Sequence, residues 1–174
     1  MNIILIGYRG SGKTTIGRLL ATELWKKFVD VDVECCNRIG IDSIAKIFEQ
    51  FGEAEWRRVE VQVTCELCTR DEHVIALGGG TLMQPSARHA VRQAPSAVRI
   101  YLYCEPEELH RRIQADTESA RTRPNLTHLG GGIEEIKAVL DERDPVYRAV
   151  ADKVFDVTHI EPKTGLRHLI SRCL

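Results

Sequence analysis

The chain has 174 residues, 28% of them charged, and a formal net charge of -1 at pH 7. This length suits one domain spanning residues 1–174, and the balanced charge gives no electrostatic reason to expect nucleic acid or an anionic membrane as partner. No apolar run reaches the roughly 20 residues that cross a bilayer, and the start lacks the basic segment of a signal peptide, so we expect a cytoplasmic protein.

Five short runs rich in β-branched residues alternate with segments of helical composition. In chain order they read NIILIG, FVDVD, HVIALGGG, VRIYLY and KVFDVT. Such alternation is typical of an α/β fold, in which helices cover a parallel sheet.

The first run leads into a phosphate-binding motif. Gly7, Gly12, Lys13 and Thr14 match G-x-x-x-x-G-K-[ST], between a predicted strand and the predicted helix TIGRLLATELWKK. The glycines let backbone N–H groups converge on a phosphate, Lys13 can bridge the outer phosphates, and Thr14 is suited to Mg²⁺. The motif therefore predicts a nucleoside triphosphate site. Its expected contacts are Gly10, Ser11, Gly12, Lys13, Thr14 and Thr15.

The second run ends in two aspartates, Asp30 and Asp32. Side chains alternate between the two sides of an extended chain, so one carboxylate is expected to face a metal ion and the other an acceptor molecule. The N-K-x-D pattern with which GTPases recognise guanine is absent from the sequence, which does not favour a GTPase.

Residues 32 to about 70 form a predicted helical insert between the second and third strands. Four apolar residues have the spacing of one helix face, namely Ile44, Ile47, Phe48 and Phe51. Ser43 can cap this helix and Gly52 can end it. The spacing therefore predicts an amphipathic helix from Ser43 to Gly52.

The same insert continues with EAEWRRVE, residues 53–60, in which Arg57 and Glu60 are i, i+3 neighbours on a helix. Glu60 can then fix the plane of the guanidinium, which suits bidentate recognition of a carboxylate or phosphate. A solvated run of charges remains the alternative interpretation of these residues alone.

Cysteine and histidine spacing favours structural roles. Cys65 and Cys68 form a C-x-x-C without a second pair, in the late turns of a predicted helix, and the histidines are scattered. We therefore expect no metal cage and, in a reducing compartment, no disulfides.

Two glycine-rich stretches follow. The third strand ends in Gly78, Gly79 and Gly80, and residues 114–132, QADTESARTRPNLTHLGGG, are polar with no apolar face to bury. Such a segment is expected to be a lid that excludes water during a reaction.

Taken in order, these stretches resemble the shikimate kinase family over nearly the whole chain. The match runs through GYRGSGKTT, FVDVD, SIAKIFEQFGEAEWRRVE, ALGGG, TRP in the lid, and ERDPVYRAVAD. The resemblance implies a P-loop three-layer α/β fold with a five-stranded parallel sheet, a helical substrate-binding insert and a lid. It also implies Mg²⁺-dependent transfer of the γ-phosphoryl group of ATP to the 3-hydroxyl of shikimate, in the pathway to chorismate and the aromatic amino acids.

The resemblance also implies residue roles. Asp32 would bind the shikimate hydroxyls and accept the proton, and Asp30 would support Mg²⁺ through water. Arg57 and Arg143 would bind the shikimate carboxylate, beside backbone groups of Gly78, Gly79 and Gly80. Lys13 and the lid residue Arg123 would neutralise the phosphates, and Arg112 is expected to stack on adenine.

Two departures from the family pattern concern the nucleotide side. The lid reads Arg123-Pro124-Asn125-Leu126 and ends in Gly130 to Gly132, a difference that concerns how the lid closes. The loop VTHIEPKTG lacks an arginine, a difference that concerns the affinity for the nucleotide.

Two other functions stay open on the sequence alone. A related small-molecule kinase, such as a gluconate kinase, would share the P-loop, although Arg57, Arg143 and the glycine triplet argue against it. A non-catalytic ATP-binding sensor would bind without turnover. The sequence shows no apolar stripe that indicates a protein partner, so a monomer is expected.

Overall fold

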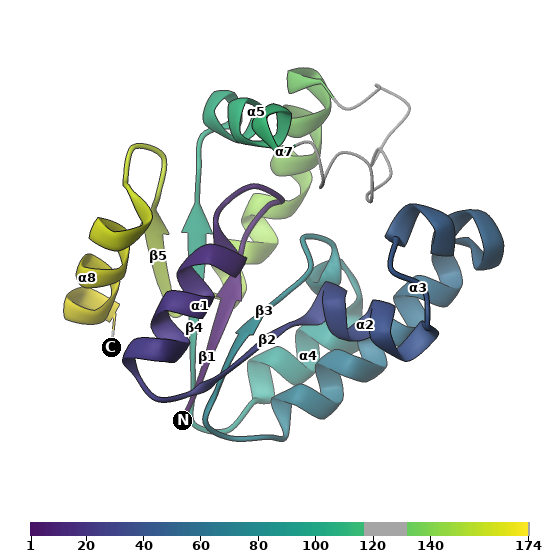
Figure 1. Cartoon of the computed structure of the whole chain (residues 1–174), viewed down its shortest axis with the longest axis horizontal. Coiled ribbons are helices and arrows are strands. Elements are labelled where there is room, and N and C mark those ends of the chain that lie inside the picture. Colours follow the sequence, from purple (N-terminus) through teal and green to yellow (C-terminus); the bar gives the residue numbers. More distant parts are fainter. Residues whose placement is uncertain (117–131, 174) are drawn as a thin grey trace.

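The computed structural model describes residues 1–116 and 132–173 (Figure 1). Its centre is a five-stranded sheet in the order β2-β3-β1-β4-β5, and every pairing is parallel. The strands are β1 (Asn2–Ile6), β2 (Lys27–Asp30), β3 (His73–Ala76), β4 (Ala97–Tyr103) and β5 (Lys153–Asp156). The predicted parallel sheet and its five strands are confirmed.

Helices follow each strand and cover both faces of the sheet (Figure 1). They are α1 (Lys13–Glu23), α2 (Val31–Ile39), α3 (Ile44–Cys68), α4 (Pro85–Gln93), α5 (Pro106–Ala115), α7 (Ile133–Val150) and α8 (Pro162–Cys173), with a 3-10 turn η1 (Thr81–Met83). None of the helices in the described ranges combines the length and apolarity needed to cross a bilayer.

The core is divided by the sheet into two clusters, because successive residues of a strand face opposite sides. Ile3 and Leu5 of β1 pack with residues of α1, α5 and α8. Ile4 and Ile6 pack with residues of α2, α3 and α4. All four are essentially inaccessible to solvent, so β1, which precedes the phosphate-binding loop, is held from both faces.

The sheet order also determines where a site can form. β1 lies between β3 and β4, so the chain crosses from one side of β1 to the other after β3. In open parallel sheets, ligands bind at the carboxyl ends of the strands where the order reverses in this way. The loops after β1, β2 and β3 all lie at that edge.

The expectation that Asp30 and Asp32 share an extended chain is wrong. β2 ends at Asp30, and Asp32 already lies in the first turn of α2. The physical reason is helix capping: Asp30 Oδ1 accepts a hydrogen bond from the Asp32 backbone N–H at 3.1 Å. The start of a helix, and not the alternation of a strand, therefore determines where Asp32 lies relative to Asp30.

The insert is helical as predicted, with α2 and α3 projecting beside the sheet (Figure 1). Ser43 caps α3 by accepting from the Lys46 N–H at 3.4 Å, and Gly52 breaks the helix with φ 81° and ψ 163°. Ile47 is fully buried, whereas Phe51 is 55% exposed beside the break. Phe51 therefore lies off the apolar face that the spacing predicted.

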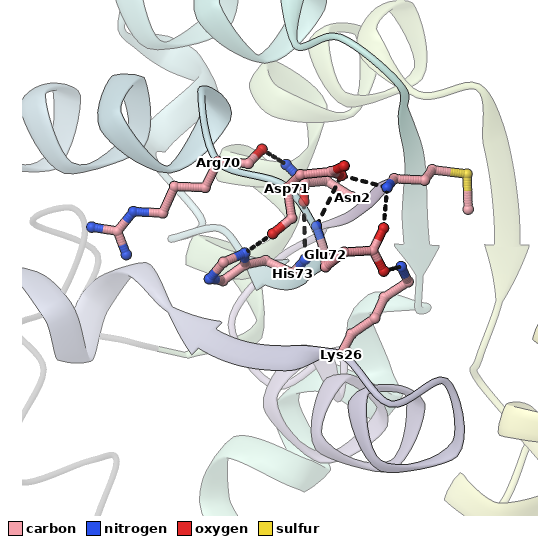
Figure 2. A network of polar contacts seen from close by, with 7 residues as sticks. Asn2, Lys26, Arg70, Asp71, Glu72 and His73 are labelled. Carbon is pink, nitrogen blue, oxygen red and sulfur yellow. Dashed lines mark hydrogen bonds and ion pairs between the residues drawn. The ribbon is translucent and has the colours of Figure 1, made fainter.

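Polar contacts also join the amino ends of β1, β2 and β3, on the side of the sheet away from the carboxyl ends (Figure 2). The buried Asn2 donates to the Arg70 carbonyl at 2.7 Å and accepts from the His73 N–H at 2.9 Å. Lys26, just before β2, pairs with Glu72, just before β3. These contacts fix how α3 returns to the sheet, far from the carboxyl ends of the strands.

Candidate active site

The loop between β1 and α1 has the backbone that an anion requires. Gly10 (φ 83°) and Gly12 (φ 91°) adopt left-handed conformations that disfavour any side chain. Gly12 is the N-cap of α1 and makes no side-chain cap, so the first N–H groups of the helix remain available to a ligand. Lys13 Nζ donates to the carbonyls of Gly7 and Tyr8, both at 2.8 Å, which holds its ammonium over the loop.

A cleft of about 850 Å³ opens above this loop. Every described residue that the sequence predicted for the nucleotide and metal lines it, namely Gly10, Ser11, Gly12, Lys13, Thr14, Thr15, Asp30 and Arg112. Thr14 Oγ1 donates to Asp30 Oδ2 at 2.7 Å. A hydroxyl and a carboxylate thus meet at the phosphate end of the cleft, and these are oxygen ligands that Mg²⁺ accepts.

The far wall of the cleft is built around Arg112. Its guanidinium donates to Glu108 at 2.7 Å and to the carbonyls of Val157 and Thr158 at 2.8 and 3.2 Å. Glu108 binds Arg111 as well, and the two arginines lower the pKa of Glu108 to about 2. Arg112 is therefore held rigidly beside the loop after β5.

A second, smaller pocket adjoins the cleft on the side of α3. Its described lining combines charged and apolar side chains with glycine backbone: Arg9, Asp32, Ile44, Phe48, Trp56, Arg57, Glu60, Gly79, Gly80 and Arg143. These residues come from the phosphate-binding loop, the insert, the glycine triplet and α7. Of the six acceptor-site residues that the resemblance implied, the pocket thus brings together five, namely Asp32, Arg57, Gly79, Gly80 and Arg143, and Gly78 does not line it.

The glycine triplet explains how these side chains can meet. A Cβ at Gly78 would lie 2.6 Å from Asp32 Oδ1 and 2.6 Å from Glu60 Oε1. A Cβ at Gly80 would lie 2.6 Å from an Arg57 guanidinium nitrogen. Because real Cβ contacts are not this short, each glycine leaves room that a charged group occupies.

Glu60 is the buried anchor of this pocket, with 1% of its surface exposed. Its carboxylate accepts from Thr81 Oγ1 at 2.6 Å and from Arg57 at 2.8 Å, which confirms the predicted i, i+3 contact. Arg57 also donates to Glu53 at 2.9 and 3.0 Å. Burial would lower the pKa of Arg57, but Glu60 and Glu53 outweigh this and raise it. The guanidinium is therefore charged and fixed.

Arg143 approaches the pocket from α7. Its guanidinium lies 3.5 Å from the position of a Cβ on Gly79. Its Nε is buried and has no hydrogen-bond partner among the residues that the structure describes. A buried N–H without a partner is costly, so this side chain suits an anionic group in the pocket.

Asp32 and Gly79 are the two described residues that line both the cleft and the smaller pocket. A group bound at the phosphate end of the cleft would therefore meet a molecule in the pocket at Asp32. Such an arrangement can transfer a group between two ligands.

Part of the predicted site lies outside the described residues, and some apolar residues that line the pocket were not predicted to do so. Arg123 and most of the lid lie outside the described residues, as do Asn125, Gly130 and Gly131. Trp56, Phe48 and Ile44 line the pocket, although the sequence placed Ile44 and Phe48 only on the apolar face of a helix and gave Trp56 no role. No sequence signal distinguishes an apolar residue that packs in a core from one that packs against a ligand.

Comparisons with known proteins agree with this geometry. The family model described as shikimate kinase matches residues 9–174. A shikimate kinase of Nitrosococcus oceani is 42% identical over 153 residues, which are 88% of this chain and 76% of that protein. Among solved structures, shikimate kinase from Acinetobacter baumannii in complex with shikimate has a TM-score of 0.87 and 34% identity, and the match covers 98% of this chain and 90% of that one.

A gluconokinase from Sinorhizobium meliloti is also similar in fold. Its TM-score is 0.61 at 17% identity, over 98% of this chain and 89% of that chain. An identity this low shows the P-loop kinase fold alone, and with the closer matches it confirms the predicted three-layer α/β architecture.

Proposed function

This chain belongs to the shikimate kinase family, and on that premise we propose that it transfers the γ-phosphoryl group of ATP to the 3-hydroxyl of shikimate. The products are shikimate 3-phosphate and ADP, and the reaction serves the synthesis of chorismate and the aromatic amino acids. The observation that carries the proposal is the junction at Asp32 and Gly79, where the phosphate-binding cleft meets the arginine-lined pocket.

Shikimate suits the smaller pocket because it is a small ring with one carboxylate and several hydroxyls. Arg57 and Arg143 supply positive charge for the carboxylate, and Asp32 supplies an acceptor for hydroxyl groups. Phe48, Trp56 and Ile44 supply apolar surface for the ring carbons. Arg57 is held by Glu60 and Glu53 before any ligand arrives, so little ordering is required on binding.

Catalysis in this proposal depends on positioning and charge neutralisation, as phosphoryl transfer generally does. The acceptor oxygen forms a bond to the γ-phosphorus as the bond between the γ-phosphorus and the oxygen that bridges it to the β-phosphate breaks. ADP is the leaving group. Asp32 orients the acceptor hydroxyl and takes its proton. Lys13, at the phosphate end of the cleft, balances the charge on the phosphates, and Arg123 of the lid adds to this.

Mg²⁺ is the metal that fits this site. Thr14 and Asp30 would hold it, since their oxygens meet at 2.7 Å within the cleft. When bound, Mg²⁺ neutralises phosphate charge. Arg112 would stack on adenine, in keeping with its fixed place in the cleft wall. We further propose that residues 1–174 act as one kinase domain, as a monomer in the cytoplasm.

The test is ADP release from Mg·ATP with shikimate, quinate, gluconate, AMP or no acceptor. The proposal expects release with shikimate far above the other four. Release with gluconate would instead favour the related small-molecule kinase. ATP binding without release for any acceptor would favour a non-catalytic sensor. Size-exclusion chromatography with light scattering tests the monomer.

A further inference from the structure

Tyr147 lies one helical turn after Arg143 on α7, so both side chains point to the same side of the helix. Its side chain is 1% exposed. The hydroxyl donates a hydrogen bond to the Gly79 carbonyl, and the positive charge of Arg143 acts on the same hydroxyl and favours a lower pKa. One phenol oxygen therefore binds the glycine loop and interacts with the charge of Arg143, which are two different parts of the acceptor pocket.

The contact with Gly79 determines how the glycine loop is turned. The Gly79 carbonyl belongs to the peptide group that also carries the Gly80 N–H, and the C=O and N–H of a planar trans peptide point in opposite directions. Holding the carbonyl at Tyr147 directs the Gly80 N–H away from α7. Both glycines line the acceptor pocket, so the hydroxyl determines which backbone groups the loop presents there.

The tyrosine itself is held in place by its neighbours. Its ring packs edge-on against Tyr101, with ring centroids 5.1 Å apart. The Tyr101 hydroxyl donates to Asp144 at 2.8 Å, and Asp144 also accepts from Arg148 at 2.6 Å. Burial raises the pKa of Tyr147 to about 12, so its hydroxyl keeps its proton, and its bond to Gly79, at neutral pH.

We propose that Tyr147 is a positioning residue for the acceptor: its hydroxyl fixes the Gly79 peptide and the Arg143 guanidinium in the arrangement that binds the substrate carboxylate. This inference rests on the proposed function, because the pocket must bind shikimate for Tyr147 to matter in this way. The phenol acts through Gly79 and Arg143 and need not touch the substrate.

The test is Tyr147→Phe, which removes the hydroxyl and keeps the buried ring. Leaving the buried Gly79 carbonyl unpaired is expected to raise the KM for shikimate by about tenfold, with a smaller change in the KM for ATP and kcat within about threefold. Shikimate methyl ester, which lacks the negative charge, provides a second measurement. Wild-type enzyme should prefer the acid strongly, and Tyr147→Phe should reduce that preference by about tenfold.

Tyr101→Phe is the matched control. It keeps the ring that packs against Tyr147 and removes only a hydroxyl whose partner is Asp144, so the acid-to-ester preference should be unchanged. KM and this preference do not depend on the fraction of folded enzyme, so reduced stability cannot mimic the expected result. A shikimate KM within twofold of wild type, or equal changes with both acceptors, would overturn the inference. Failure of the wild type to phosphorylate shikimate would instead overturn the proposed function.

Discussion

Substituting Gly80 by alanine tests whether the glycine triplet makes room for Arg57. Gly80 has φ -97° and ψ -9°, which alanine adopts without strain. The added methyl group would lie 2.6, 2.9 and 3.0 Å from the NH1, NH2 and Cζ atoms of Arg57. The guanidinium must therefore move by about 1 Å to reach ordinary van der Waals separation. A shift of this size breaks the 2.8 Å bond between Arg57 and Glu60.

The expected cost follows from that bond. A hydrogen bond between charged groups contributes about 1.5–3 kcal/mol, and about 1.4 kcal/mol corresponds to a tenfold change in affinity. Gly80→Ala should therefore raise the shikimate KM by about 10- to 150-fold, measured by ADP release at saturating Mg·ATP. The KM for ATP should change by less than about twofold, because Gly80 does not line the nucleotide cleft.

Gly165→Ala provides the control, because a Cβ in α8 at that position meets its nearest neighbour at an ordinary 3.4 Å. Its kinetics should match the wild type. An unchanged shikimate KM in Gly80→Ala would show that Arg57 can leave Glu60 without loss, and would refute the reasoning from steric room.

Three further substitutions test the charged groups. Arg57→Ala should raise the shikimate KM by at least about tenfold, since it removes a charged partner of the carboxylate; an unchanged KM would remove Arg57 from the pocket. Asp32→Asn should nearly abolish turnover while ATP binding, measured by calorimetry, persists; turnover within threefold of wild type would exclude Asp32 as the orienting group and base. Glu108→Gln removes the ion pairs with Arg111 and Arg112 and should lower the free energy of unfolding at pH 7. The expected loss is only about 1 kcal/mol, because Glu108 is partly exposed to solvent.

The pH dependence of that last difference has a defined sign. The folded pKa of Glu108 is lowered to about 2 by Arg111 and Arg112, whereas an unfolded glutamate titrates near about 4.3. The stabilisation is therefore fully present above about pH 4.3 and is lost as the pH falls toward 2. Denaturant unfolding of both proteins at pH 7, 4 and 2.5 measures it, and a pH-independent difference would contradict the ion-pair origin.

The sequence predicted the sheet well because each strand contains a short run of β-branched or aromatic residues and a helix follows it. Residues of β1 from Ile3 to Ile6 are buried on both faces of the sheet, and all four are therefore apolar. The predicted boundaries were poorer at β2. There Val31 and Asp32 extend the apparent alternation, but a capping contact from Asp30 starts a helix. Local hydrogen bonding therefore overrode a periodic pattern that was only a few residues long.

In the candidate site, the sequence succeeded where one spacing determines one contact. Arg57 and Glu60 meet because three residues on a helix bring side chains together. Tyr147 could not be assigned a partner in this way, because Gly79 is 68 residues away in the chain. Only the packing of α7 against the loop after β3 brings them together, and no local pattern encodes that distance.

The lack of side chains at Gly78, Gly79 and Gly80 is what allows the two cavities to share a wall. Asp32 and Glu60 reach the loop through the room at Gly78, Arg57 through the room at Gly80, and Arg143 lies beside Gly79. A side chain at Gly78 or Gly80 would separate charged groups that the proposed chemistry needs within one small volume. Gly79 therefore separates the two cavities with backbone atoms alone. The hydrogen bond from Tyr147 to the Gly79 carbonyl holds this backbone in one orientation. On this argument, substitutions in the triplet should affect the acceptor more than ATP.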